Sequence, residues 1–371
     1  MHRPARTFLI IFSGLITGLL LLIAAINYLI DPFDYFKGLS PDGLSKQPLQ
    51  SHERFDRAIK IMIRKPQAIL LGSSRVKAGF SQLYFSQLVG KSAYKAAFNG
   101  ARFDEIYNYF EHALFNQPDL KDVFIGIDFF AFSETIKPVS EYSLKRLKRE
   151  TLPFDDFFKL LLSQEVLKLS YENHPFKQVT PKQESRFFAK IDEHEYIGIS
   201  QSMIEKPQMF FESEKIHIMD SYKIDEKKVE MFRRLVETCN NNHIRLKVVF
   251  LPVHNAYGKF IYDCDRWRDF EDLKRQLCSC TPIYDFSGFT ALNAEVLSNE
   301  EPSTYFFEFS HFSPIYGKII LDKIYGIEDR CPDSGKLLTP ENIEDHLKIQ
   351  SRQRDAWLEQ NMSNKQDKNR I

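Results

Sequence analysis

The stretch "AILLGSSRVKAGF", residues 68–80, places two adjacent serines directly after a short apolar run. Four apolar residues lead into Gly72, and the polar and apolar mixture after Arg75 is typical of a helix start. A turn of this composition can cap a helix, because serine is a preferred N-cap residue. It can also hold a serine hydroxyl at the carboxyl edge of a parallel sheet, and the rest of the chain has to distinguish these two roles.

Short apolar runs alternate with helical patterns along the chain. Beyond 68–72, we expect strands within "SAYKAAFNG" (92–100), "DVFIGIDFF" (122–130), "RLKVVFLPV" (245–253) and "TPIYDFSG" (281–288). Helical apolar spacing is found within residues 52–67, 102–117, 227–244 and 313–326. Strands that alternate with helices indicate a parallel sheet covered on both faces. We therefore predict a three-layer α/β domain of the flavodoxin-like kind.

The composition excludes some functions and permits others. The chain has 371 residues, of which 43% are hydrophobic, and its 50 Lys and Arg balance 50 Asp and Glu. A neutral chain without a basic stripe or a signature motif gives no reason to expect a nucleic-acid partner. Cys278 and Cys280 resemble half of a metal site, but no second pair or nearby histidine completes it. We expect no metal and no organic cofactor.

The N-terminal segment predicts a membrane anchor. No charged residue occurs between Arg6 and Asp31, and this length is enough to cross a bilayer as a helix. Arg3 and Arg6 precede the segment, and Asp31 and Asp34 follow it, so the positive-inside rule keeps residues 1–6 in the cytoplasm. A cleaved signal peptide is the alternative, but Ala24 and Ala25 match a cleavage site poorly. We expect a single-pass inner-membrane protein whose C-terminal domain is extracytoplasmic, or periplasmic.

The remaining boundaries follow from composition. Residues 7–30 form the expected transmembrane helix, and residues 31–50, rich in Pro, Gly and Ser, form a linker. Residues 51–328 form the α/β domain. Within it, residues 133–222 are a long insertion, which in such folds is usually a lid or a subdomain over the site. Residues 329–371 are polar and are expected to be a partly helical extension.

A serine nucleophile needs a base within reach and a third group that orients the base. His311 in "YFFEFSHFSPIYG" precedes the last expected helix, so its loop opens at the same carboxyl edge as the serines. Glu308 lies three residues earlier, and one turn of loop can bring its carboxylate to the imidazole. Ser74, His311 and Glu308 are therefore the candidate catalytic residues, with Ser73 the alternative nucleophile.

These motifs together resemble the SGNH/GDSL hydrolase family. Residues 72–75 match its first block, with Ser74 as nucleophile, and residues 308–311 match its Asp-x-x-His block. Gly100 in "YKAAFNGAR" matches the glycine whose N–H points at the oxyanion, and Asp128 in "FIGIDFF" matches the third block. The likeness is greatest to the membrane-anchored extracytoplasmic branch, which includes the D-alanyl transfer protein of lipoteichoic acid synthesis and the alginate O-acetylation proteins.

Two positions depart from the family pattern. Asp128 stands where the family has an asparagine that donates to the oxyanion, and an ionised carboxylate there would oppose the developing charge. Arg75 and Arg102 are candidates for a replacement donor. Glu308 replaces the family's aspartate, which is a mild change because other serine hydrolases use Glu in the orienting position. His254, at the end of the fourth expected strand, can line the pocket, act as a second-choice base or be a hydrogen-bonded loop histidine.

The resemblance implies acyl-ester cleavage or transfer on an O-acylated cell-envelope glycan, with an acetyl group as the favoured acyl group. The cytoplasmic membrane and membrane acyl-transfer proteins are the further partners that it implies. Because Asp128 departs from the pattern, the alternative is a degenerate domain that acts as a membrane-tethered glycan- or protein-binding module. Hydrogen-bond distances among Ser74, His311 and Glu308 discriminate between the two.

Overall fold

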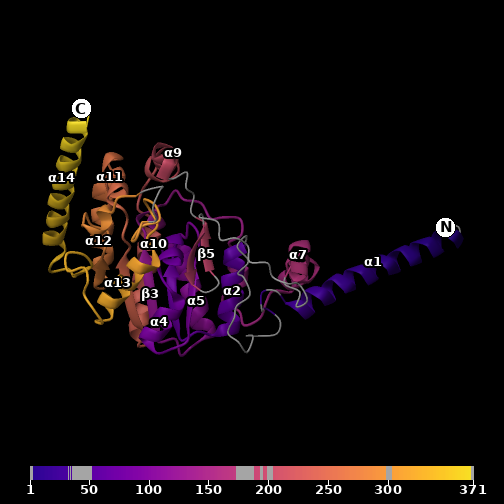
Figure 1. Ribbon diagram of the computed structural model, residues 1–371. Coiled ribbons are helices and arrows are strands. Elements are labelled where there is room, and N and C mark those ends of the chain that lie inside the picture. The colour runs from indigo at the N-terminus through magenta and orange to yellow at the C-terminus, as the bar shows by residue number, and fades with distance from the viewer. Residues whose placement is uncertain are drawn as a thin grey trace.

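The computed structural model describes residues 3–31, 33, 35, 52–172, 188–192, 195–198, 204–297 and 303–368. Most of the expected linker, including Asp34, lies outside these residues. The described chain forms an α/β domain from which one long helix, α1 (Arg3–Ile30), projects (Figure 1).

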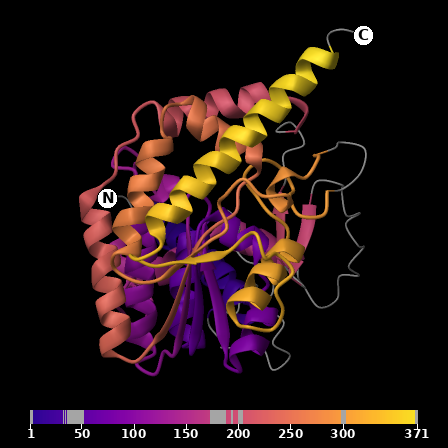
Figure 2. The same cartoon turned by 90° about the vertical axis from the view of Figure 1, so that its left-hand side faces the viewer.

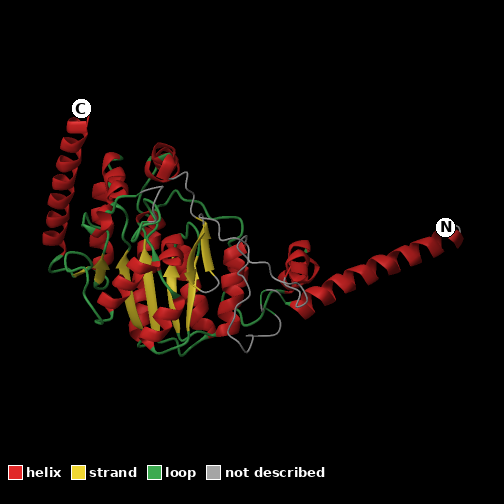
Figure 3. Cartoon of the chain, in the orientation of Figure 1, coloured by secondary structure: helices red, strands yellow, loops and turns green. Residues whose placement is uncertain are grey.

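A six-stranded sheet forms the centre of the domain (Figure 3). Its strands, in spatial order, are β2 (Ala93–Ala97), β1 (Ala68–Gly72), β3 (Asp122–Ile127), β6 (Arg245–Phe250), β7 (Ile283–Asp285) and β8 (Lys336–Leu338). The first five are parallel, and β8 pairs antiparallel with β7. All five expected strands and the parallel sheet are thus confirmed. With β8 left aside, the strand order is that of one of the two common doubly wound sheets.

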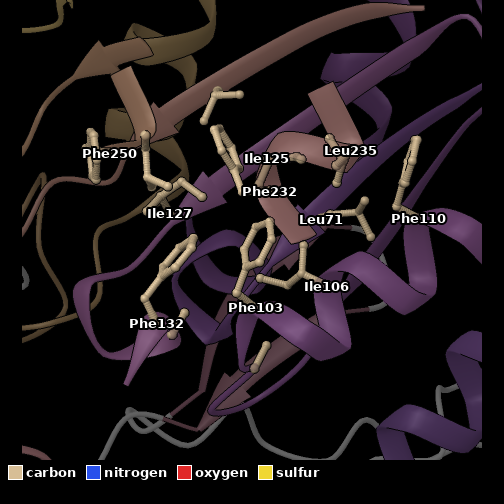
Figure 4. Close-up of a cluster of buried hydrophobic side chains, with 14 of the residues drawn as sticks. Leu71, Phe103, Ile106, Phe110, Ile125, Ile127, Phe132, Phe232, Leu235 and Phe250 are labelled. Atoms are coloured by element: carbon tan, nitrogen blue, oxygen red, sulfur yellow. The ribbon is translucent and has the colours of Figure 1, made fainter. Parts of the chain in front are cut away.

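Helices cover both faces of the sheet because alternate strand residues point to opposite sides. On one face, Ile69 and Leu71 join a cluster with α2 (Glu53–Arg64), α5 (Phe103–Asn116), α10 (Glu226–Asn241), α11 (Asn255–Asp263) and α12 (Trp267–Cys278). Part of this cluster is drawn in Figure 4. On the other face, Ala68 and Leu70 pack with α3 (Ser74–Gly79), α4 (Gln82–Val89) and α13 (Pro314–Ile324).

The insertion 133–222 divides into separate parts. Helices α6 (Phe154–Leu162) and α7 (Gln164–Glu172) pack on the C-terminal end of α1. The hairpin of β4 (Phe188–Asp192) and β5 (Glu195–Gly198) forms its own two-stranded sheet, and α9 (Pro207–Glu214) lies against α11 through aromatic contacts. Of these three described parts, α9 is the one that packs on the segment carrying His311.

Residues beyond 328 form part of the domain, and this corrects the expectation of a polar extension from residue 329. Strand β8 extends the sheet, and α14 (Ile343–Lys368) crosses the near side of the domain in Figure 2. Leu338, Ile343 and Leu347 are buried against Cys278. One of these side chains comes from β8 and two come from one face of α14, and together they hold the segment against the domain. The boundary at 328 is therefore wrong.

Candidate functional site

The candidate site lies at the carboxyl edge of the sheet, between β1 and β3. The chain continues from β1 to β2 on one side of this point and from β3 to β6 on the other. The turn after β1 carries Ser74, the residue after β3 is Asp128, and residue 100 follows β2. In doubly wound sheets the crevice at such a switch point is the usual ligand site. A fourth segment, residues 303–313, brings His311 to the same edge.

The two serines of the opening stretch have different roles. Ser73 is fully buried, and its Oγ accepts a hydrogen bond from the backbone N–H of Arg75 at 3.2 Å, as an N-cap does. Ser74, the first residue of α3, is only half-buried. One serine therefore caps the helix while the other presents its hydroxyl at the edge of the sheet.

Close backbone approaches hold α3 against the sheet and α13. A Cβ built on Gly72 or on Gly126 would meet Val76 Cγ2 at 2.3 Å, so the Val76 side chain occupies the space above both glycines. A Cβ on Gly317 would meet the carbonyl oxygen of Gly79 at 1.6 Å. Because α13 begins just after His311, this contact between α3 and α13 brings His311 toward Ser74.

The three candidate catalytic side chains form one hydrogen-bonded chain. His311 Nε2 lies 2.8 Å from Ser74 Oγ, and His311 Nδ1 is hydrogen-bonded to Glu308 Oε1. The segment turns back on itself, since Phe306 and Phe312 form an antiparallel bridge and the Phe307 N–H donates to the His311 carbonyl at 2.9 Å. This turn places Glu308 and His311 side by side.

Glu308 is held as a carboxylate although it is only 1% exposed. Burial by itself raises the pKa of a carboxyl group, but the neighbouring His311 charge and the hydrogen bonds from His311 and Ser310 outweigh burial and lower the pKa of Glu308. Ser310 donates from its backbone N–H to Glu308 Oε2 at 2.8 Å and from Oγ to Oε1 at 2.9 Å. A buried, ionised carboxylate on Nδ1 fixes the tautomer in which Nε2 accepts from a hydroxyl.

Arg75 and Asp128 form a buried ion pair beside the hydrogen-bonded chain of Ser74, His311 and Glu308. Arg75 Nη1 pairs with Asp128 Oδ1, and Arg75 Nε donates to the Ser310 carbonyl at 2.8 Å. Burial alone lowers the pKa of Arg75, but the charge and hydrogen bond of Asp128, together with the nearby Tyr257 and Glu214, outweigh burial and raise the pKa. The guanidinium thus holds the His311 segment through Nε and Asp128 through Nη1, so the negative charge of Asp128 has a cationic partner.

Arg102 and Gly100 lie on the turn that follows β2. The Arg102 guanidinium pairs with Asp104 at the start of α5. This pairing holds the guanidinium at the helix terminus and does not direct it toward Ser74. Gly100 has φ +61°, and a Cβ there would meet nothing within 4 Å. Glycine is therefore needed for its left-handed backbone conformation and not for space. The Ala101 N–H donates to the Phe98 carbonyl at 3.3 Å and closes the turn.

His254 is a loop histidine with both ring nitrogens engaged. Its Nδ1 accepts from the Ala256 N–H at 3.1 Å, and its Nε2 lies 2.7 Å from the Glu295 carbonyl, to which it donates. Burial is the main cause that lowers the pKa of His254. Its backbone N–H donates to the Phe309 carbonyl at 3.1 Å. His254 thus supports the His311 segment through its backbone N–H. Because both of its ring nitrogens are already hydrogen-bonded, it is not placed as a second base.

Part of the insertion packs on the segment that carries His311. The rings of Phe210 and Phe211 on α9 lie 6.3 and 5.1 Å from the ring of Phe309. Tyr257 donates to Glu214, the last residue of α9, at 2.8 Å, and its ring lies 5.1 Å from the Arg75 guanidinium carbon. Helix α9 is therefore the portion of the insertion that covers this side of the site.

Sequence reasoning missed several residues that position the site. Ser310 bonds to both Glu308 and His311, its Oγ lying 3.0 Å from His311 Nδ1. Glu53 Oε2 accepts from the Asn99 N–H at 2.8 Å, and Arg54 donates to the Asn99 carbonyl at 3.1 Å. Glu53 and Arg54 are two of several charged residues spread along α2, so nothing in the local sequence assigned them to the Gly100 turn.

Metal ligation has no candidate within the ranges that the structure describes, since no three His, Cys, Asp or Glu side chains gather there to hold an ion. All five cysteines lie in these ranges, and none forms a disulfide. No protein-family model and no curated protein matches the chain.

Proposed function

We propose that the chain is an extracytoplasmic serine esterase or O-acyltransferase of the SGNH type. The observation that carries this proposal is the 2.8 Å contact of His311 Nε2 with Ser74 Oγ, with the Glu308 carboxylate on the opposite ring nitrogen. A nucleophile, a base and an orienting acid in this order are what covalent acyl transfer requires.

The reaction begins when Ser74 Oγ attacks the acyl carbonyl and its proton passes to His311 Nε2. Glu308 stabilises the imidazolium that forms. Collapse of the tetrahedral intermediate breaks the bond to the alcohol, which leaves with the proton from His311, and the acyl group remains on Ser74. Water or a sugar hydroxyl, deprotonated by His311, then takes the acyl group and restores the serine. These steps need no metal or organic cofactor.

The backbone N–H groups of Ser74 and Gly100 are the proposed oxyanion donors. Two observations are compatible with this role. The Gly100 turn is held from α2 by Glu53 and Arg54, so its amides have a fixed orientation. The Asp128 charge, which would oppose an oxyanion, is compensated by Arg75.

Helix α1 supports a location at the cytoplasmic membrane. Residues 4–30 form one helix long and apolar enough to span a membrane. With Arg3 and Arg6 on the cytoplasmic side, the domain lies outside the cytoplasm. We propose that the substrate is an O-acyl group of a cell-envelope glycan, with O-acetyl as the favoured group. Membrane acyl-transfer proteins are the proposed partners. The hydrogen-bonded Ser74, His311 and Glu308 favour this enzyme over a catalytically degenerate glycan- or protein-binding module.

Hydrolysis of a fluorogenic acetyl ester by the full-length protein in detergent tests the chemistry. Ser74→Ala is expected to lower the rate of ester hydrolysis by about a thousandfold or more, because covalent catalysis is lost. Ser73→Ala, at the adjacent capping serine, is the matched control and should keep activity. Equal activity in the wild type and Ser74→Ala would contradict the proposal.

A further inference from the structure

An apolar stripe lies on the outer face of α6. Phe154, Phe158 and Leu162 are 79%, 42% and 39% exposed. Their spacing of four residues places them on one face of the helix. The rings of Phe154 and Phe158 lie 4.6 Å apart, so the stripe is continuous along the first turn.

The opposite face of α6 is fixed to the domain. Asp156 accepts from Arg146 Nε at 2.8 Å and from Nη2 at 3.2 Å, and Leu160 is buried with Phe55 and Val166. The helix therefore cannot turn its apolar stripe inward without breaking this partly buried ion pair. The exposure of the stripe is a built feature of the fold.

Helix α6 is also tied to the end of α1. Asn27 of α1 is fully buried, and its Nδ2 donates to the carbonyls of Leu161 and Ser163 at 2.8 and 3.2 Å. The last carbonyls of a helix lack partners within the helix, so Asn27 supplies a donor to Leu161 at the end of α6. The Ser163 carbonyl, which also accepts from the Leu167 N–H of α7, takes the second hydrogen bond. Figure 1 shows α7 standing beside the C-terminal end of α1.

The position of Asn27 along α1 locates this contact relative to a bilayer. The apolar span covers Pro4–Ile30, 27 residues, whereas the hydrocarbon core needs about 20. If Arg6 lies at the inner boundary, about 20 residues of helix place the outer boundary near Ile26. Helices α6 and α7 thus meet α1 at the level of the outer headgroups, where aromatic side chains are enriched.

We propose that α6 lies in the outer surface of the bilayer that α1 crosses and seats the domain on it. The occupant of the apolar stripe is lipid, because α6 packs on α1 and Asn27 joins it to the part of that helix that leaves the hydrocarbon. A helix with one apolar face in the headgroup region is a common interfacial element. The exposed Tyr171 of α7 adds a further aromatic side chain to the same hairpin. This inference rests on the proposed membrane anchorage and not on the proposed ester chemistry.

Tryptophan quenching in vesicles tests the inference on the full-length chain. Phe158→Trp and Phe154→Trp variants are reconstituted into phosphatidylcholine vesicles with and without brominated acyl chains. The native Trp267 and Trp357, on α12 and α14, give the wild-type baseline. Leu20→Trp in α1 is the positive control, and Ile349→Trp on α14, at an equally exposed apolar position, is the negative one.

We expect the emission that each α6 tryptophan adds to be blue-shifted and quenched by the brominated lipid, as for Leu20→Trp, while Ile349→Trp stays at baseline. Quenching of Leu20→Trp without quenching at 154 and 158 would overturn the α6 proposal and leave the anchorage intact. Absence of quenching at Leu20→Trp would overturn the anchorage and this inference together. The ester assay reports separately on the chemistry, so these failures can be told apart.

Discussion

Arg75 donates a hydrogen bond from Nε to the backbone carbonyl of Ser310, 2.8 Å away. Each of these residues is the sequence neighbour of a residue in the candidate catalytic chain, Ser74 in one case and His311 in the other. One guanidinium therefore joins the turn after β1 to the segment before α13. Because its Nη1 pairs with Asp128, the end of β3 is held in the same arrangement.

Replacement of Arg75 is expected to slow the reaction without removing its chemistry. Arg75→Lys keeps a charge beside Asp128, but a single ammonium lacks the planar fork that reaches two acceptors at once. A misplaced His311 segment should lower kcat on the order of 100-fold, with little change in KM. Arg75→Ala is unsuitable, because an unpaired buried Asp128 costs about 3–5 kcal/mol. Arg245→Lys, whose partner Asp122 begins β3 at the opposite edge of the sheet, is the control and should leave kcat near the wild-type value.

Labelling with a serine-directed phosphonate should identify Ser74 as the nucleophile. Mass spectrometry is expected to find the adduct on Ser74, and His311→Ala should abolish it because the hydroxyl loses its base. Ser73→Ala should still be labelled, with a loss of about 1 kcal/mol in the free energy of unfolding from the missing cap. An adduct on Ser73 would mean that the two serines exchange the roles assigned to them here. No adduct on either serine would favour the binding module.

Acid should destabilise the folded protein in part through His254. Burial lowers the pKa of His254 below its ordinary value of 6.5, so the unfolded state binds the proton more readily. The free energy of unfolding should therefore fall as the pH drops through 6.5 toward the lowered pKa. Urea denaturation of the detergent-solubilised protein between about pH 5 and pH 7 measures this slope.

His254→Asn should flatten that slope, because asparagine can still cap α11 but does not titrate in this range. His112, whose pKa burial also lowers, contributes a slope of the same sign and remains in the variant. An unchanged slope in His254→Asn would show that the pKa of His254 is the same in the folded and unfolded states.

Loss of Asn27 should loosen the α6–α7 hairpin. Asn27→Leu leaves the Leu161 and Ser163 carbonyls without the amide, a loss of about 1–3 kcal/mol felt locally. Hydrogen exchange in α6 and α7 should accelerate while ester hydrolysis at Ser74 is retained. Ser13→Leu, at an exposed position of the same helix, is the control and should leave exchange unchanged. Unaltered exchange in Asn27→Leu would contradict the role of this side chain.

The full-length chain should fractionate with membranes and resist release by carbonate. The segment between Arg6 and Asp31 carries no charge, so its extraction into water is strongly unfavourable. Residues beyond Asp31 should be digested by external protease in spheroplasts. Recovery of the full-length chain in the soluble fraction would end the anchor hypothesis.

Local pattern was sufficient for the strands but not for the last segment of the domain. The apolar residues of β1 and β3, and Val248–Phe250 of β6, are buried on both faces, so these strands can be recognised without any knowledge of their neighbours. Strand β8 has three residues, and only one of them, Leu338, is buried. A short edge strand within polar sequence carries too little signal, and only its pairing with β7 identifies it.

By itself the sequence determined the five parallel strands, four of the helices that cover them, the apolar N-terminal helix and the candidate residues Ser74, His311 and Glu308. Apolar periodicity and the positions of glycine, serine and histidine are local properties, so they are legible without coordinates. Only the tertiary structure decided which groups meet. Arg75 turned to Asp128 and Ser310, and Glu53 to the Asn99 turn, because buried charges take whichever partners packing brings within reach. Residues 235 positions apart in the chain became partners through the close approach of Gly79 and Gly317.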